Sequence, residues 1–378
     1  MPARADRSPV PTIVIAAGGT AGHVVPALAV ADALKARGAA VEFIGGERAE
    51  AELVPSAGYP FHRLRVAGID RRNPARAARA LLLAAGGVAR ARRLLRRIDA
   101  DAVLGGGGYA SGPVGLAAIT LRLPLTLTEA DSHMGVANRL LAPFAKRVFL
   151  AFPPADRSGG RHEPRGGGRA RGDAKYEVIG RPVPAGTGRA DRHAARARFG
   201  IPDEAQCLLI FGGSLGARKL NDAALEAFGA DAPCAVLHAC GRRDHDELRR
   251  RLDALDSPAH YRLYPYIEPF ADALAAADLV AARAGGSVLE VAAAGLPAIL
   301  VPYPHATADH QSANARFMER AGAAVIVPDS ELDGPRLAHE VGALLGAPQR
   351  TAAMSKAARQ AARPDAADRI AEDLLKLV

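Results

Sequence analysis

Residues 12–45 read TIVIAAGGTAGHVVPALAVADALKARGAAVEFIG, and this stretch decides the class of fold. The apolar run at 12–17 is typical of a buried strand, and it ends in the glycine-rich loop 18–23. A helix is expected over about 26–37, and a second strand at 41–45. A strand, a helix and another strand at this spacing predict a βαβ unit of a parallel sheet.

Apolar runs of strand length recur along the rest of the chain, separated by helical runs rich in Ala, Leu and Arg. The strands expected from them lie at 101–105, 123–129, 147–152, 206–213, 234–241, 278–286, 297–303 and 323–328. Because strands and helices alternate, we expect parallel sheets that are covered by helices on both faces. The last helical run, 366–378, is amphipathic and could pack on either half of the chain.

A stretch rich in Gly and Arg divides the two halves. Residues 157–173 read RSGGRHEPRGGGRARGD and hold almost no apolar side chains. This composition predicts a flexible linker or surface loop. We therefore expect an α/β fold with two doubly wound domains. The first covers 1–160, 157–175 is the linker, and the second covers 176–363, with its βα series beginning near Tyr176.

Composition limits the class of protein. The chain has 378 residues, 49% of them apolar, so two domains can each bury a core. The formal net charge of +9 predicts a polyanionic partner: nucleic acid, a phosphate ligand or an anionic membrane. The three cysteines show no metal or redox spacing. The run 102–121 is uncharged but holds six glycines and Pro113, so it does not predict a membrane span.

Three glycine-rich loops each follow an expected strand and precede a helix. They read GGTAGH (18–23), GGGGYASG (105–112) and GGSLGAR (212–218), and none of them is a G-x-G-x-x-G or a P-loop sequence. Such a loop directs free backbone N–H groups and a helix dipole at one point, which favours an anion. A single loop of this kind could serve only as a tight turn. Three of them at the carboxyl ends of strands favour phosphate binding.

The second half carries the run RAGGSVLEVAAAGLPAILVPYPHATADHQSANA at 283–315. The carboxylate of Glu290 suits the two vicinal hydroxyls of a ribose, although a glutamate at a helix start is also stabilised by the helix dipole alone. Gln311 and Asn314 are three residues apart and share a helix face. Their amides suit sugar hydroxyls, or they form an ordinary polar surface.

Several motifs together carry a resemblance to a known family. They are GGTAGHVVPALAVA, GGYASGP, TEADSHMGVANRLLA, GRPV, FGGSLGARKLN and EVAAAGLPAILVPYPHATADHQSANA, in this order. The chain resembles the MurG family, the UDP-N-acetylglucosamine–undecaprenyl-pyrophosphoryl-N-acetylmuramyl-pentapeptide transferases. The resemblance implies a GT-B fold: two Rossmann-like domains that face a central cleft, with a C-terminal helix at about 364–378 that crosses back to the first domain.

The resemblance also implies the reaction. An inverting, peripheral enzyme on the cytoplasmic face of the membrane would move N-acetylglucosamine (GlcNAc) from UDP-GlcNAc to the 4-hydroxyl of an undecaprenyl-linked muramyl pentapeptide. It places donor contacts at Gly213, Ser214, the backbone of Ile267, Glu290, Gln311 and Asn314. It places acceptor contacts at Thr20, Ala21, Gly22, Gly107, Tyr109 and Asn138, and catalytic groups at His23, Glu129 and Asp131.

The chemistry of the candidates leaves the general base open. Imidazole titrates near neutrality, so His23 is the first candidate, with Glu129 and Asp131 as rivals. No D-x-D metal motif stands out, and we expect neither metal ligands nor a tightly bound cofactor, with a divalent cation as a possible stimulant. The loop 212–218, with Arg218, is expected to stabilise the departing UDP.

A basic and apolar run at 71–98, RRNPARAARALLLAAGGVARARRLLRRI, suits docking on an anionic membrane surface. An amphipathic helix pair that covers the sheet with a solvated arginine face explains the same pattern. Aromatic residues make up only 4% of the chain, so we expect no nucleic-acid partner. Two further enzyme classes fit the same architecture: a GT-B transferase that moves a UDP-sugar to another glycolipid, and a UDP-GlcNAc 2-epimerase-like enzyme.

The chain departs from the family pattern at a few positions. Ala21 stands where the loop GGTGGH has glycine, and TEADS replaces HEQN, which puts Asp131 where an amide is usual. Leu215 follows the serine where glutamine is common. Arg181 and Pro184 stand where many members have the Asn and the Arg of G-N-P-V-R. These departures bear on individual contacts and leave the motif order intact.

Overall fold

The computed structural model describes residues 10–66, 74–153, 175–213, 216–306 and 309–378, without the side chains of 74–85. The chain forms two compact units. The first is Met1–Pro182 with Pro364–Val378, and the second is Val183–Arg363. No helix among the described residues has the length and apolarity that crossing a membrane requires.

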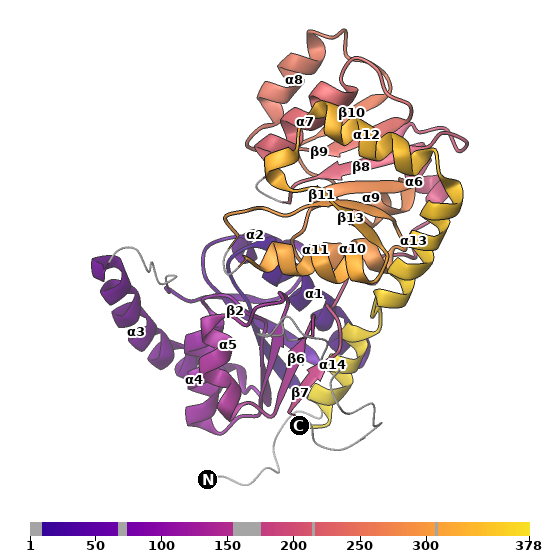
Figure 1. The fold of residues 1–378 in the computed structure, drawn as a ribbon. Helices are drawn as coiled ribbons and strands as arrows, with labels where there is room; N and C mark the ends of the chain where they lie inside the picture. The colour runs from indigo at the N-terminus through magenta and orange to yellow at the C-terminus, as the bar shows by residue number, and fades with distance from the viewer. Residues whose placement is uncertain (1–9, 67–73, 154–174, 214–215, 307–308) are drawn as a thin grey trace. The chain divides into compact units, whose positions relative to one another are not determined.

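Seven parallel strands build the sheet of the first unit, in the order β3-β2-β1-β4-β5-β6-β7 (Figure 1). The strands are β1 (Thr12–Ala16), β2 (Ala40–Gly45), β3 (Phe61–Arg63), β4 (Ala102–Gly105), β5 (Leu125–Glu129), β6 (Arg147–Leu150) and β7 (Tyr176–Val178). The strand order reverses between β1 and β4. The loops after these two strands therefore flank the switch point at which open parallel sheets bind ligands.

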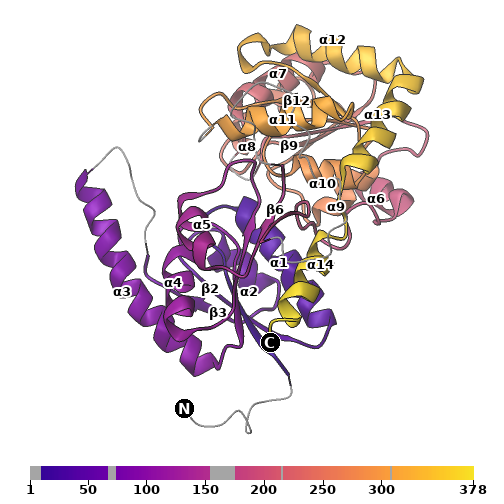
Figure 2. The ribbon, with the colours of Figure 1, turned by 60° about the horizontal axis from the view of Figure 1, so that its bottom comes forward.

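Helices cover both faces of this sheet (Figure 2). They are α1 (Ala21–Ala36), α2 (Glu50–Ser56), α3 (Pro74–Ile98), α4 (Ser111–Leu121), α5 (Val136–Leu141), the 3-10 turn η2 (Ala142–Phe144) and α14 (Ala366–Leu375). Alternate residues of β1 face opposite layers. Ile13 and Ile15 pack in the core under α1 and α14, whereas Val14 packs in the core under α3 and α4.

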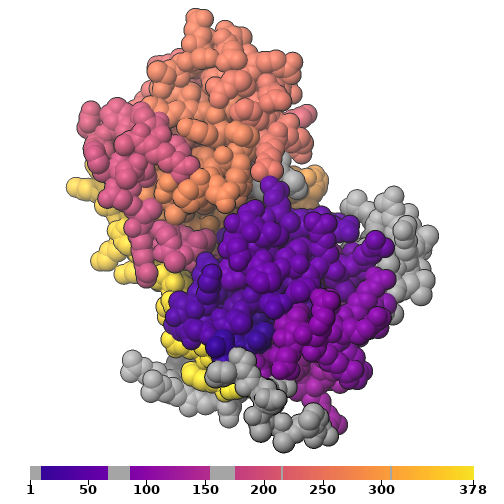
Figure 3. All heavy atoms as spheres, turned by 180° about the vertical axis from the view of Figure 1, so that it is seen from behind, coloured from indigo at the N-terminus to yellow at the C-terminus, as the bar shows by residue number. Residues whose placement is uncertain are grey.

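The C-terminal helix belongs to the first unit. Ile370 and Leu374 of α14 are fully buried in the same core cluster as Leu34 of α1. Arg37, after the end of α1, pairs with Asp368 and Glu372 of α14. In the space-filling view from behind, yellow C-terminal residues lie against the indigo residues of the first unit (Figure 3).

The structure corrects two sequence predictions. The segment at Tyr176 does not begin the second βα series, because β7 pairs in parallel with β6 and extends the first sheet. The helix expected from Pro26 begins five residues earlier, at Ala21, with Pro26 inside it. Because Pro26 has no N–H, the helical hydrogen bond to the carbonyl of Gly22 is missing from this first part of α1. All but the last residue of the expected linker, 157–175, lies outside the described residues.

Six parallel strands build the sheet of the second unit, in the order β10-β9-β8-β11-β12-β13. The strands are β8 (Cys207–Phe211), β9 (Ala235–Ala239), β10 (Tyr261–Tyr264), β11 (Leu279–Arg283), β12 (Ala298–Val301) and β13 (Ala324–Ile326). The helices are α6 (Arg192–Phe199), α7 (Arg218–Phe228), α8 (His245–Asp253), α9 (Phe270–Ala276), α10 (Val288–Ala293), α11 (His310–Arg320), η4 (Asp329–Glu331), α12 (Gly334–Leu345) and α13 (Pro348–Ala361). The switch point here lies between β8 and β11.

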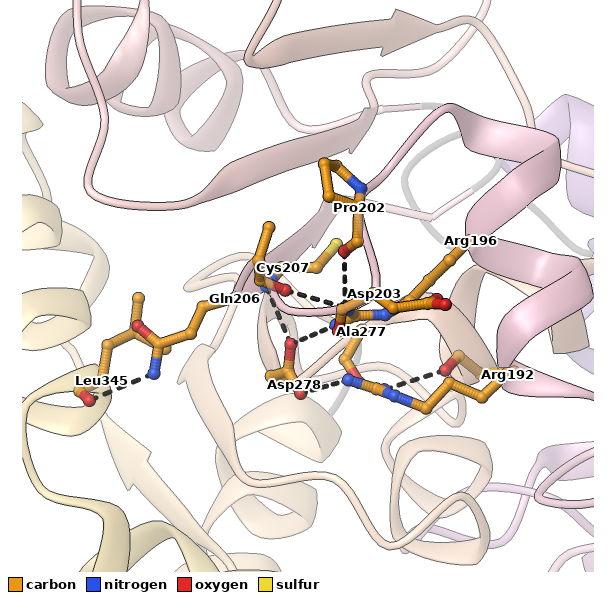
Figure 4. Close-up of polar contacts among 11 residues, drawn as sticks. Arg192, Arg196, Pro202, Asp203, Gln206, Cys207, Ala277, Asp278 and Leu345 are labelled. Atoms are coloured by element: carbon orange, nitrogen blue, oxygen red, sulfur yellow. Dashed lines mark hydrogen bonds and ion pairs between the residues drawn. The ribbon is translucent and has the colours of Figure 1, made fainter.

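A buried arginine fastens the amino ends of β8 and β11 (Figure 4). The side chain of Arg196 is 1% exposed and donates to Asp278 over 2.7 Å. It also donates to the carbonyls of Pro202 and Ala205, and Asp278 accepts from the backbone N–H of Cys207. Because the ligand-binding edge of a parallel sheet is the carboxyl edge, this pair serves the stability of the second unit at the opposite end of its strands.

Candidate active site

Three side chains with acid–base chemistry meet at the carboxyl edge of the first sheet. His23 lies in the first turn of α1, Glu129 ends β5, and Asp131 follows two residues later. One ligand atom from each lies within 4.8 Å of the others. The structure thus brings together the three catalytic candidates from segments that are more than a hundred residues apart in the chain. The prediction named no metal ligands, yet one imidazole and two carboxylates at this spacing are also a donor set for a divalent cation.

Glu129 is a buried carboxylate, 5% exposed. Its Oε2 accepts from the backbone N–H of Gly135 over 2.8 Å and from the amide of Asn138 over 3.0 Å. Burial raises the pKa of Glu129 above its ordinary range; the donors Gly135 and Asn138 oppose that rise, and the charge of Asp131 adds to it. The carboxylate is therefore fixed in position and holds a proton more readily than a glutamate in water.

The imidazole of His23 lies against the second glycine loop. Gly107 has a φ of +89°, and a β-carbon there would stand 2.6 Å from Cδ2 of His23. Among the described residues, Nδ1 of His23 is buried and accepts or donates no hydrogen bond. The ring is therefore positioned by packing against this loop, because only glycine permits this backbone conformation and this close approach.

A carboxylate that the sequence prediction missed joins the glycine loops. Glu50, in the first turn of α2, is 0% exposed. Its Oε2 accepts from the backbone N–H of Gly19, and its Oε1 accepts from that of Gly46, each over 2.9 Å. The hydroxyl of Tyr109 donates to the same Oε1 over 2.7 Å. In the sequence, a glutamate at a helix start indicates only a favourable interaction with the helix dipole. No local pattern shows that the side chain of Glu50 is buried.

The predicted acceptor residues take different positions. Thr20 is exposed at the N-cap of α1, Ala21 is half-buried and Gly22 is exposed. Ala21 has no positive φ, so the helix start accepts alanine where the family has glycine. Asn138 is 2% exposed and donates to the carbonyl of Thr128 as well as to Glu129, so it positions the carboxylate. The hydroxyl of Tyr109 is engaged by Glu50.

In the second unit, the third glycine loop leads from β8 into α7. Gly213 has a φ of +92°, while Ser214 and Leu215 lie outside the described residues. Beside this loop, Asp244 accepts from Arg243 over 2.9 Å and from Arg218 over 3.2 Å. The hydrogen bond from Arg243 is the main cause that lowers the pKa of Asp244, and Arg218 adds to it. The sequence prediction named Arg218 but missed the carboxylate that orients it.

The remaining donor candidates follow the carboxyl ends of β10, β11 and β12. Glu290 is 7% exposed in the first turn of α10, and Ile267 is 3% exposed between β10 and α9. Asn314 of α11 is fully buried and donates to the carbonyl of Ala284, after β11, over 3.1 Å. Gln311 accepts from the backbone N–H of Tyr303, after β12. The two amides of α11 therefore fasten the loops after β11 and β12.

The two halves of the chain match two domains of one enzyme family. Residues 13–150 match the glycosyltransferase family 28 N-terminal domain, and residues 207–370 match the family 28 C-terminal domain. The fold and the site thus define a glycosyltransferase. Related proteins that match nearly the whole chain identify the family within this class. The chain belongs to the MurG family of family 28 glycosyltransferases.

Two of these relatives are named UDP-N-acetylglucosamine–N-acetylmuramyl-(pentapeptide) pyrophosphoryl-undecaprenol N-acetylglucosamine transferase. The protein from Moorella thermoacetica is 41% identical over 97% of this chain and 99% of its own length. The protein from Methylococcus capsulatus is 42% identical over 96% of this chain and 98% of its own.

Solved structures agree with the fold. The crystal structure of MurG from Acinetobacter baumannii is 31% identical and has a TM-score of 0.72, covering 97% of this chain and 100% of that one. This likeness confirms the predicted GT-B fold class. A UDP-GlcNAc 2-epimerase from Neisseria meningitidis has a TM-score of 0.65 at 14% identity, over 97% of this chain and 100% of that one. At that identity the likeness shows a shared fold alone.

Proposed function

We propose that this protein is an inverting glycosyltransferase of peptidoglycan synthesis, which moves GlcNAc from UDP-GlcNAc to the 4-hydroxyl of an undecaprenyl-linked N-acetylmuramyl pentapeptide. The observation that carries this function is identity above 40%, over nearly the full length of both chains, to transferases named for this reaction. An epimerase activity has only a shared fold to support it.

His23 is the general base in this proposal. The attacking hydroxyl loses its proton as the bond to the anomeric carbon forms, and the bond from that carbon to UDP breaks with its electron pair on the UDP oxygen. The ring of His23 lies within 4.8 Å of Glu129 and Asp131, by one ligand atom of each. Their negative charge stabilises the imidazolium that forms when His23 accepts the proton.

The departing UDP needs a cationic partner. The N-terminus of α7 supplies a helix dipole after the third glycine loop, and Arg218 begins this helix. Asp244 orients Arg218 and Arg243 beside that loop. We therefore propose that the second unit stabilises the diphosphate with its own groups, and that a divalent cation is at most a stimulant.

The decisive assay is transfer of radiolabelled GlcNAc from UDP-GlcNAc to a short-chain lipid-linked acceptor. We expect transfer with inversion, which persists when EDTA removes divalent cations. The variant His23→Ala should lower kcat by roughly 10²–10⁴-fold with little change in KM. Absence of transfer would refute the function. An effect of His23→Ala confined to KM would leave the function in place and reassign the base to Glu129 or Asp131.

The place of action is part of the proposal: the cytoplasmic face of the membrane, with the enzyme bound peripherally to anionic lipid. Exposed apolar side chains support it, since Leu116 of α4 is 46% exposed, Leu140 of α5 is 69% exposed and Phe144 of η2 is 61% exposed. From residue 74 onwards, the predicted basic run forms a single helix, α3, and not a helix pair. In its described turns Leu95 is buried, while the arginines at 90, 93, 96 and 97 are exposed.

A further inference from the structure

One buried guanidinium links the two segments that carry the three acid–base groups. Arg181 is 3% exposed and follows β7 at the edge of the first unit. Its Nη2 donates to the carbonyl of Gly22 over 2.8 Å, and its Nη1 donates to the carbonyl of Ala130 over 3.3 Å. Gly22 directly precedes His23, and Ala130 lies between Glu129 and Asp131.

The contact with Gly22 has a clear origin in α1. In an α-helix, the carbonyl of residue 22 accepts from the N–H of residue 26. Residue 26 is Pro26, which has no N–H, so the helix cannot satisfy the carbonyl of Gly22. Arg181 supplies the missing donor. The guanidinium therefore completes the helix turn on which His23 is mounted.

The second contact, with the carbonyl of Ala130, acts on the segment that carries Glu129 and Asp131. The carbonyl of Ala130 belongs to the short turn between the two carboxylates, and Ala130 is 6% exposed. A planar guanidinium donates to the two carbonyls from two nitrogens held in fixed geometry, whereas a lysine ammonium offers one nitrogen on a flexible stem.

We propose that Arg181 is a positioning residue for the transfer reaction, which sets the spacing of His23 from Glu129 and Asp131. It touches no reacting atom in this role and acts through the two backbone carbonyls. The inference rests on the proposed function. It concerns a residue at which this chain departs from the Asn of the G-N-P-V motif that the resemblance describes.

The test compares Arg181→Met and Arg181→Lys with the wild type in the GlcNAc transfer assay. We expect Arg181→Met to lower kcat by about 10–100-fold, as a small misplacement of catalytic groups does, with KM for UDP-GlcNAc within about threefold of the wild-type value. The fall in kcat at a nearly constant KM separates misplaced catalytic groups from lost substrate binding. Arg181→Lys should also lower kcat, because one nitrogen on a flexible stem does not reproduce the two fixed contacts.

A matched control is Arg196→Met, which removes another buried arginine that donates to backbone carbonyls, in the second unit. This variant should melt at a lower temperature and keep kcat within about twofold. If Arg181→Met keeps kcat within threefold, or raises KM without lowering kcat, the positioning role is wrong. If Arg181→Met does not fold, Arg181→Lys decides: wild-type kcat overturns the proposal, and at least a fivefold loss supports it. Failure of the wild type itself to transfer GlcNAc would instead refute the proposed function.

Discussion

A β-carbon on Gly107 would stand 2.6 Å from Cδ2 of His23, so the imidazole rests directly on the backbone of the second glycine loop. Gly107→Ala should therefore displace the ring and lower kcat by at least roughly 10²-fold, the cost of moving a catalytic group by about 1 Å. The measurement is kcat for GlcNAc transfer, with circular dichroism to verify folding.

The matched control for that substitution is Gly38→Ala. Gly38 also has a positive φ, +83°, but nothing lies within 4 Å of a β-carbon there. It therefore takes the same backbone strain without the collision, and we expect wild-type kcat. Equal kcat for the two variants would show that the contact between Gly107 and His23 has no catalytic consequence.

Glu50 holds the glycine loops through three hydrogen bonds, from the N–H groups of Gly19 and Gly46 and from the hydroxyl of Tyr109. Glu50→Ala leaves buried donors without an acceptor and should lower the free energy of unfolding by about 1–3 kcal/mol or more. The sequence predicts phosphate binding by the glycine loops, and the resemblance places acceptor contacts in the loops at 18–23 and 105–112. KM for the lipid acceptor should therefore rise more than KM for UDP-GlcNAc.

Tyr109→Phe should produce a weaker form of this effect, because it removes only one of the three hydrogen bonds that Glu50 accepts. Burial, helped by the bond to Glu50, raises the pKa of Tyr109 to about 12, so the phenol stays a hydrogen-bond donor at neutral pH. We expect a smaller rise of the acceptor KM than in Glu50→Ala. Glu52→Gln, on α2, should behave as the wild type, since residue 52 is not buried. An acceptor KM that is unchanged in Glu50→Ala would separate Glu50 from acceptor binding.

The glycine loops and the strand pattern were predictable from the sequence because both are local signals. The length of the apolar run and the glycines that follow it predicted the bounds of β1 to within one residue. The sheet to which β7 belongs was not predictable. Its residues Tyr-Glu-Val suit a strand, but their pairing with β6 is set by the rest of the first sheet.

The site divides in the same way. His23, Glu129 and Asp131 came from motifs that resemble a family, and the fold places them together. Glu50 and Arg181 were missed as structural groups because their roles depend on partners far along the chain: Gly19 for Glu50, and Gly22 for Arg181. A local pattern cannot show that a charged side chain is buried against distant backbone groups.

The raised pKa of Glu129 predicts a pH-dependent loss of stability. Below the ordinary glutamate value near 4.5, the carboxyl is protonated in both the folded and the unfolded chain. As pH rises towards the higher folded pKa, Glu129 ionises in the unfolded chain, whereas burial disfavours its ionisation in the folded protein. The free energy of unfolding therefore falls over this range. The wild type should therefore lose stability relative to Glu129→Gln, by about 1.4 kcal/mol for each pKa unit of the rise.

Urea unfolding of both proteins between pH 4 and pH 8 measures this difference. The free-energy difference between wild type and Glu129→Gln should change across the window above about 4.5 and become constant once Glu129 is ionised in the folded chain. A flat difference for Glu129→Gln would contradict the raised pKa.

The pair of Arg196 and Asp278 predicts a purely structural effect. Arg196→Met leaves Asp278 and several carbonyls without their buried donor, and Asp278 retains 33% exposure. We expect a loss of about 3 kcal/mol, the lower end of the range for broken buried pairs, because the remaining charge is partly solvated. Thermal unfolding should show a lower melting temperature, and transfer kinetics measured below it should be unchanged.

The exposed apolar surface of the first unit predicts where the enzyme meets a bilayer. Leu140 is 69% exposed and Phe144 is 61% exposed, in the adjoining elements α5 and η2. Each apolar side chain that enters the membrane contributes up to about 1.5–3 kcal/mol. The double variant Leu140→Ser, Phe144→Ser should thus bind anionic vesicles at least tenfold more weakly.

The control Leu255→Ser removes a 42% exposed leucine of the second unit and should leave vesicle binding unchanged. Sedimentation with vesicles of anionic and of neutral lipid measures both variants. Equal binding of the double variant and the wild type would exclude this surface, and equal binding to neutral and anionic vesicles would remove the electrostatic part of the proposal.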